Sequence, residues 1–160
     1  MTLAEDIALL TRVPLFADLA GDQLRLLAFS AIRLELPAGR VLFRAESKAL
    51  SGFVVMTGEI ELSHHKGEET VPLGRFGPGV LIGEMALFVE TKRPATATAV
   101  VDSEVVEIDG TLMRRMLTEY PDIAVKIFSK LRGRLGETLS ELGGVEAKLD
   151  ALHYPGPAKR

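Results

Sequence analysis

Seven short β-rich runs between residues 33 and 108 constrain the fold of this chain more than any other feature. Turn-forming residues separate them, such as PAG at 37, TG at 57, KGEE at 66 and GPG at 77. Many short strands at regular spacing, with Gly and Pro in the turns, are typical of antiparallel sandwiches and barrels. The sequence therefore predicts a mainly β protein, an antiparallel jelly roll over residues 33–109, with strands at 33–36, 41–44, 52–56, 59–64, 70–76, 95–101 and 105–108.

Helical patterns flank this β-rich part on both sides. Two amphipathic runs, over residues 3–10 and 24–32, precede the strands, and Asp22 is placed to cap the second run. After the strands, Asp109 is expected to cap a helix that ends before Pro121. These patterns predict N-terminal helices over residues 1–32, C-terminal helices over 110–144, and a short helix with a disordered tail over 145–160.

The long helical pattern after Pro121 carries an apolar stripe. Its positions alternate in steps of four and three, the spacing of a coiled-coil seam, at Leu131, Leu135, Thr138, Leu142 and Val145. This spacing predicts a homodimer formed through the C-terminal helix. The alternative is that the stripe packs back on the β-barrel. Gly133 and Gly136 each cost such a helix about 1 kcal/mol relative to Ala, so the seam is expected to be short.

The segment over residues 83–99, GEMALFVETKRPATATA, concentrates the residues that bind phosphate. Gly83 has no Cβ and allows the backbone to approach a ligand closely. Glu84 supplies a carboxylate that can accept hydrogen bonds from hydroxyl groups, and Arg93 supplies a planar fork of five donors that suits phosphate. Residues 85–88 are expected to start a short helix between them. The segment therefore predicts a phosphate site with a hydroxyl-binding acid beside it.

These residues resemble the phosphate-binding cassette of cyclic nucleotide-binding domains of the catabolite activator (Crp/Fnr-like) family. The matching pattern is Gly-Glu-x-Ala-Leu, a short loop, and Arg followed by small residues and Thr. The resemblance implies that Glu84 accepts the ribose 2′-hydroxyl and that Arg93 pairs with the cyclic phosphate. Pro94 departs from the family pattern, because the usual Ala, Ser or Thr donates a backbone N–H that proline lacks. The candidate ligand-binding set in the cassette is Ile82, Gly83, Glu84, Met85, Ala86, Arg93, Pro94, Ala95 and Thr96.

The resemblance continues through EVVEID and the helix ending YPDI without a gap. In that register Arg134 lies where the family has an arginine near the cassette acid, and Thr138 lies where it has a threonine that binds the adenine amino group. The next family position, a serine, is Leu139 here. The alternatives are that Arg134 is a solvated helix charge and that Thr138 is a polar residue tolerated in the seam.

Composition excludes several other classes. The chain has no cysteine, which rules out disulfides, cysteine-ligated metal and thiol catalysis. Its 19 basic residues are scattered and its net charge is −3, so we expect no nucleic acid binding. No apolar run reaches the length of a membrane span and the first residues are acidic, so a cytoplasmic protein is expected. His64 and His65 are adjacent and would point to opposite faces of a strand, which disfavours a metal site and an enzyme on this fold.

Together with the resemblance, these features imply a single-domain cyclic nucleotide sensor. Cyclic AMP is favoured over cyclic GMP, because residue 94 carries no hydroxyl, and the signal is expected to pass through movement of the C-terminal helix to an unknown protein partner. One alternative is a degenerate domain that acts as a protein-interaction module, motivated by Pro94. Another is the sensor part of a longer transcription regulator, since about sixteen residues after Gly144 are too few for a helix-turn-helix.

Overall fold

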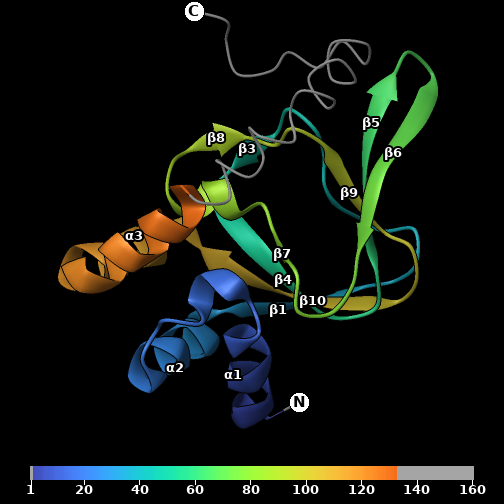
Figure 1. Cartoon of the computed structure of the whole chain (residues 1–160). Helices are drawn as coiled ribbons and strands as arrows, with labels where there is room; N and C mark the ends of the chain where they lie inside the picture. Colours follow the sequence, from blue (N-terminus) through green and yellow to red (C-terminus); the bar gives the residue numbers. More distant parts are fainter. Residues whose placement is uncertain (1, 133–160) are drawn as a thin grey trace, which may run out of the picture.

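The computed structural model describes residues 2–132, which form a β-barrel flanked by helices (Figure 1). The first helices are α1 (Leu3–Thr11), η1 (Pro14–Phe16) and α2 (Gly21–Ser30). The short helix η2 (Glu84–Leu87) interrupts the strands, and α3 (Gly110–Glu119) follows them. The strands are β1 (Ile32–Leu36), β2 (Val41–Phe43), β3 (Lys48–Ala49), β4 (Ser51–Thr57), β5 (Ile60–Lys66), β6 (Glu69–Phe76), β7 (Leu81–Ile82), β8 (Thr91–Lys92), β9 (Thr96–Ala99) and β10 (Ser103–Asp109).

The strands of the described residues form two four-stranded sheets and one two-stranded sheet. The orders are β1-β10-β4-β7, β2-β9-β5-β6 and β3-β8, with antiparallel pairing in each. The predicted antiparallel jelly roll is therefore confirmed, and each of the seven predicted runs contains a strand. The sequence did not reveal β3, β7 and β8, because a two-residue strand is too short to show a period.

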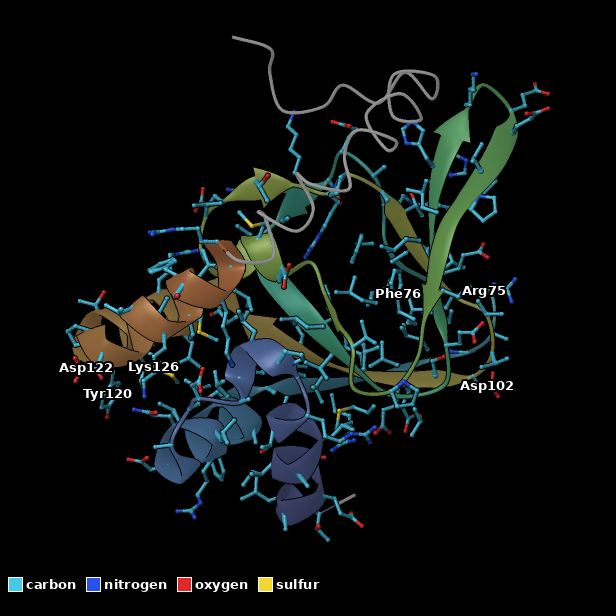
Figure 2. The ribbon with its side chains drawn as sticks, viewed as in Figure 1. Arg75, Phe76, Asp102, Tyr120, Asp122 and Lys126 are labelled. Atoms are coloured by element: carbon cyan, nitrogen blue, oxygen red, sulfur yellow. The ribbon has the colours of Figure 1, made fainter. Side chains whose placement is uncertain are left out.

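The alternation of side chains along β4 divides the core into two layers. Val54 and Met56 pack with the helices, while Phe53 and Val55 point between the sheets. Figure 1 shows α1 and α2 against the β1-β10-β4-β7 sheet, which completes the first layer. On the opposite sheet, Figure 2 shows Phe76 on the inner side of β6 and Arg75 on its outer side.

The start of α2 corrects one prediction. Asp22 lies in the first turn of this helix and Ala20 precedes its first residue, so Asp22 is not the cap. The physical reason is a competing hydrogen bond, because the Gln23 side chain reaches back to the residue before the helix. Gln23 Oε1 accepts a hydrogen bond from the Ala20 N–H at 2.8 Å. This bond fixes the start of the helix before Asp22.

The C-terminal part follows the predictions as far as it is described. Asp109 caps α3 by accepting a hydrogen bond from the Thr111 N–H at 3.0 Å, and α3 ends before Pro121 as predicted. A further helical segment spans residues 121–132. Within it Leu131, the first position of the predicted seam, is partly buried against the core. The other seam positions, Arg134 and Thr138 lie outside the described residues. None of the described helices is both long and apolar enough to cross a membrane.

Candidate functional site

The cassette begins with a backbone conformation that favours glycine. Gly83 follows β7 with φ of 74° and precedes η2, the short helix predicted near this position. A Cβ built on Gly83 would stand 2.5 Å from Arg93 Nη1, a distance that real Cβ atoms essentially never show. Glycine is thus required here both by the left-handed φ and by the close approach of the arginine.

Arg93 lies almost completely inside the barrel, with 4% of its surface exposed. Its guanidinium carbon lies 4.3 Å from the ring centroid of Phe43 and 5.3 Å from that of Phe53. Nη2 donates a hydrogen bond to the Ser51 carbonyl oxygen at 2.8 Å. Nη1 is buried and has no hydrogen-bond acceptor among the described residues. The guanidinium therefore keeps one donor that only a further acceptor can satisfy.

The backbone of Arg93 is held as firmly as its side chain. Its N–H donates to the carbonyl oxygen of Ser47, and its carbonyl oxygen accepts from the Glu46 N–H, both at 2.8 Å. Glu46 adopts φ of 69°, a value rare for residues other than glycine. The β3-β8 pairing lies beside these bonds. This loop fixes the position from which the arginine enters the barrel.

The electrostatics of the site favour an anion. Burial lowers the pKa of the Arg93 guanidinium below its ordinary value, and the negative charge of Glu107 opposes that shift. Glu107 is linked to the site through Ser51, whose Oγ donates to Glu107 Oε2 at 2.6 Å. Arginine remains protonated in proteins, so the site holds a desolvated cation. An unpaired donor on a desolvated cation is suited to a phosphate oxygen.

The structure places the other predicted residues in different surroundings. Ile82 pairs with Phe53 across β7 and β4 and is buried, as are Ala86, Ala95 and Thr96. The hydroxyl of Thr96 accepts a hydrogen bond from the Ala45 N–H at 2.9 Å, so it supports the loop after β2. Glu84 is partly exposed at the first position of η2. Met85 is half exposed and Pro94 is exposed.

Four residues of the site were not predicted from the sequence. Phe43 and Phe53 enclose the guanidinium, and Ser51 and Glu107 bind or face it. Alternation along β4 could have placed Phe53 inside the barrel. The contact with Glu107 depends on strand pairing between β4 and β10, in which Ser51 lies opposite Asp109, and no local pattern reveals it.

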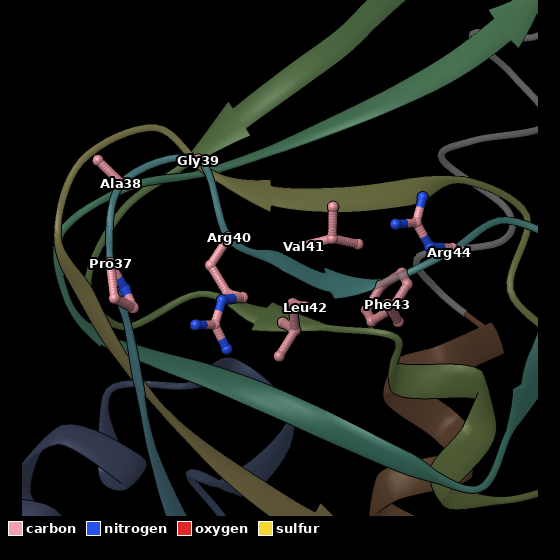
Figure 3. Close-up of a pocket in the computed structure, with 8 residues that line it drawn as sticks. All are labelled: Pro37, Ala38, Gly39, Arg40, Val41, Leu42, Phe43 and Arg44. Carbon is pink, nitrogen blue, oxygen red and sulfur yellow. The ribbon is translucent and has the colours of Figure 1, made fainter.

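A cavity of about 640 Å³ follows the β1-β2 turn and β2, lined by residues 37–44 (Figure 3). Figure 3 shows Arg40 and Leu42 on one side of β2 and Val41 on the other. Phe43 is one of the lining residues and also contacts Arg93. The volume of the cavity lies within the range of small-molecule sites, and two arginines line the cavity.

Among residues 2–132 the structure groups no set of three or more His, Asp or Glu side chains that could hold a metal ion. His64 and His65 lie on the β5-β6 hairpin, where His65 Nδ1 lies 3.3 Å from Thr70 Oγ1. The unpaired donor of the Arg93 cation is what suits this site to an anion.

Comparison with known proteins agrees with this chemistry. A family model of the cyclic nucleotide-binding domain matches residues 33–120. The chain is similar to a cyclic nucleotide-binding-like protein from Brucella abortus bv. 1 str. 9-941, with 44% identity and a TM-score of 0.66, over 71% of this chain and 98% of that chain. It is also similar to the catabolite activator protein of Thermus thermophilus, with 30% identity and a TM-score of 0.70, over 83% of this chain and 63% of that chain.

A third similar structure shares the fold. It is the regulatory domain of Toxoplasma gondii PKA in co-crystals with cAMP, with 23% identity and a TM-score of 0.67, over 71% of this chain and 43% of that chain. The chain spans only 35% and 10% of the lengths of two curated relatives that it matches, so it corresponds to one part of each. Because the family model covers more than half of the 160 residues, this chain belongs to the cyclic nucleotide-binding domain family and has the fold of catabolite-activator-type proteins.

Proposed function

We propose that this protein is a cytoplasmic cyclic nucleotide sensor that binds cyclic AMP in preference to cyclic GMP. One observation carries the proposal, namely the buried Arg93 guanidinium, whose unpaired Nη1 lies beside the left-handed Gly83 at the start of η2. A cyclic phosphate supplies the negative charge and the acceptor that this donor lacks. The family membership supports the same ligand class.

The remaining ligand contacts follow from the family pattern. Glu84 accepts the ribose 2′-hydroxyl from its place at the start of η2, and Ile82, Met85, Ala86, Ala95 and Thr96 complete the cassette. Arg134 supports the cassette acid and Thr138 binds the base, both from beyond the described residues. The preference for cyclic AMP rests on residue 94. In the family a hydroxyl at that position hydrogen-bonds the guanine amino group, and Pro94 carries no hydroxyl.

The signal leaves the site through the C-terminal helix. Ligand binding shifts the population toward a position of this helix over the cassette, which changes the surface that a protein partner meets. The described part of the helix is tied to residues 14–18, the N-terminal joint between α1 and α2. Lys130 Nζ donates to the Pro14 carbonyl oxygen at 2.6 Å and pairs with Asp18 at 2.8 Å. The seam predicted beyond Leu131 also forms a homodimer, while Leu131 itself packs against the core.

Thermal unfolding with cyclic AMP or cyclic GMP at about 1 mM tests the ligand. A ligand with a dissociation constant near 10 μM adds roughly 2.7 kcal/mol to the free energy of unfolding, which raises Tm by several degrees. The control is 5′-AMP, which carries the same base with an open phosphate. A rise in Tm with cyclic AMP and a smaller rise with the other two are expected, and unchanged Tm with both cyclic nucleotides would contradict the proposal.

A second candidate is a protein-interaction module that has lost nucleotide binding. Two observations favour it, the missing N–H at Pro94 and the packing of Arg93 inside the barrel. Saturable binding of any cyclic nucleotide at micromolar concentration would remove this candidate. The same module in a longer regulator is also compatible with the greater length of the curated relatives.

A further inference from the structure

The Arg93 guanidinium is engaged by two sets of contacts inside the barrel, and one of them is linked to Glu107. The rings of Phe43 and Phe53 lie over its guanidinium and contact each other, with their centroids 5.7 Å apart. The Ser51 carbonyl oxygen accepts from Nη2, and the same residue donates its hydroxyl to Glu107. Each of these contacts stabilises the arginine in this inward position, and stacking on aromatic rings is stronger for a desolvated guanidinium than for an exposed one.

The inward position of the guanidinium limits access to Nη1, the donor atom that has no acceptor among the described residues. Nη1 is buried, and a Cβ at residue 83 would stand only 2.5 Å from it, so little space is open around this atom. A phosphate has to reach this atom, so the guanidinium or its neighbours must move before the anion can bind. Every contact that holds the arginine inward then reduces the fraction of molecules that can accept the ligand. The apparent dissociation constant rises by the same factor.

We propose that Phe43 and Phe53, together with the Ser51–Glu107 pair, set the ligand affinity of this site by competing with the cyclic phosphate for Arg93. This inference rests on the proposed function and adds residues outside the cassette that determine affinity. Glu107 faces the guanidinium with a negative charge, as an anionic ligand would, so both compete for the same cation. Phe43 also lines the cavity along β2, so the same side chain borders that space and contacts the arginine.

Calorimetric titration of cyclic AMP into the full chain tests the competition. Phe43→Leu keeps an apolar side chain and removes the ring over the guanidinium, and it should lower the dissociation constant about five- to tenfold. The matched control is Phe76→Leu, because Phe76 packs in the same interior cluster and is not among the rings over Arg93. Its dissociation constant should stay within about twofold of wild type.

The titration separates failure of this inference from failure of the proposed function. Equal or weaker binding by Phe43→Leu, with wild-type protein that binds cyclic AMP, overturns the competition alone. Absence of binding to cyclic AMP and cyclic GMP by wild type and by both variants overturns the proposed function and the competition with it.

A measurement without nucleotide tests the inward position directly. Arginine-specific modification by phenylglyoxal, followed residue by residue with mass spectrometry, reports how often the Arg93 guanidinium is accessible. Arg93 should react slowly in wild type and in Phe76→Leu. It should react several-fold faster in Phe43→Leu and in Glu107→Gln, which retains an acceptor for Ser51 and loses the charge. Equal rates in wild type, Phe43→Leu and Glu107→Gln would overturn the proposal.

Discussion

Gly83 and Arg93 lie so close together that a Cβ on residue 83 would stand 2.5 Å from Arg93 Nη1. Nine residues of chain, including η2 and β8, separate the two positions. The turn after β7 and the guanidinium therefore form one unit, in which the absence of a side chain at one position makes room for the charge of the other. This unit is where the cyclic phosphate is proposed to bind.

Gly83→Ala should damage both stability and ligand binding. The methyl group meets Arg93 Nη1, and alanine also adopts the left-handed φ of 74° at a cost of about 1–2 kcal/mol. Gly67→Ala is the matched control, since Gly67 has φ of 64° and nothing within 4 Å of a built Cβ. Urea unfolding should show the cost of the left-handed φ in both variants and a larger total loss of stability in Gly83→Ala, because only that methyl group meets Arg93. Cyclic AMP titration should show weakened binding only in Gly83→Ala. Wild-type affinity in Gly83→Ala would show that the phosphate site lies elsewhere.

Arg33 should contribute measurably to stability, because it ties α1 to the sheet. Its guanidinium forms hydrogen bonds to Asp6 at 2.6 and 2.7 Å and also contacts Glu104, and these bonds raise the pKa of Arg33. Arg33→Met should lower the free energy of unfolding by about 1–2 kcal/mol. Arg75→Met, which removes a more exposed arginine paired with two glutamates, should cost less than about 1 kcal/mol. Equal losses in chemical denaturation would mean that the Arg33 pairs add nothing beyond ordinary surface charges.

Lys130 should control the titration of Asp18. The hydrogen bond from Lys130 lowers the pKa of the Asp18 carboxyl from its ordinary value of 3.8. A depressed folded-state pKa contributes stability that is present above pH 3.8 and is lost as the pH falls through the lowered value. In Lys130→Met the pKa of Asp18, followed by NMR, should rise toward 3.8. An unchanged Asp18 pKa would show that residues 121–132 are not tied to the N-terminal joint in solution.

The strands and the two residues of the phosphate unit were predictable because their signals are local. Turn residues delimit the strands, and the cassette pattern places Gly83, Glu84 and Arg93 in one stretch of sequence. The cap at Asp109 was equally local, whereas Asp22 was assigned wrongly because Gln23 supplied a competing bond. Local chemistry of this kind can be recognised without knowing which strands pair.

The inward packing of Arg93 was not predictable, because it depends on strand pairing. Phe43 lies on β2, Phe53 on β4 and Glu107 on β10, and only the closed barrel brings these residues to the guanidinium. The hydrogen bond that the Thr96 hydroxyl accepts from the Ala45 N–H was not predictable either, because it joins β9 to the loop after β2. Residues fifty positions apart, such as Phe43 and Arg93, leave no periodic pattern in the sequence that would reveal their contact.

Calorimetric titration of cyclic AMP into wild type, Arg93→Ala and Arg75→Ala tests the central claim most directly. Wild type and Arg75→Ala should bind one cyclic AMP per chain with the same micromolar or tighter dissociation constant. Arg93→Ala should bind roughly 30- to 1,000-fold more weakly, since it loses about 2–4 kcal/mol of charge-assisted hydrogen bonding. Equal affinity of Arg93→Ala and wild type, or no saturable binding by wild type at about 1 mM, would contradict the account.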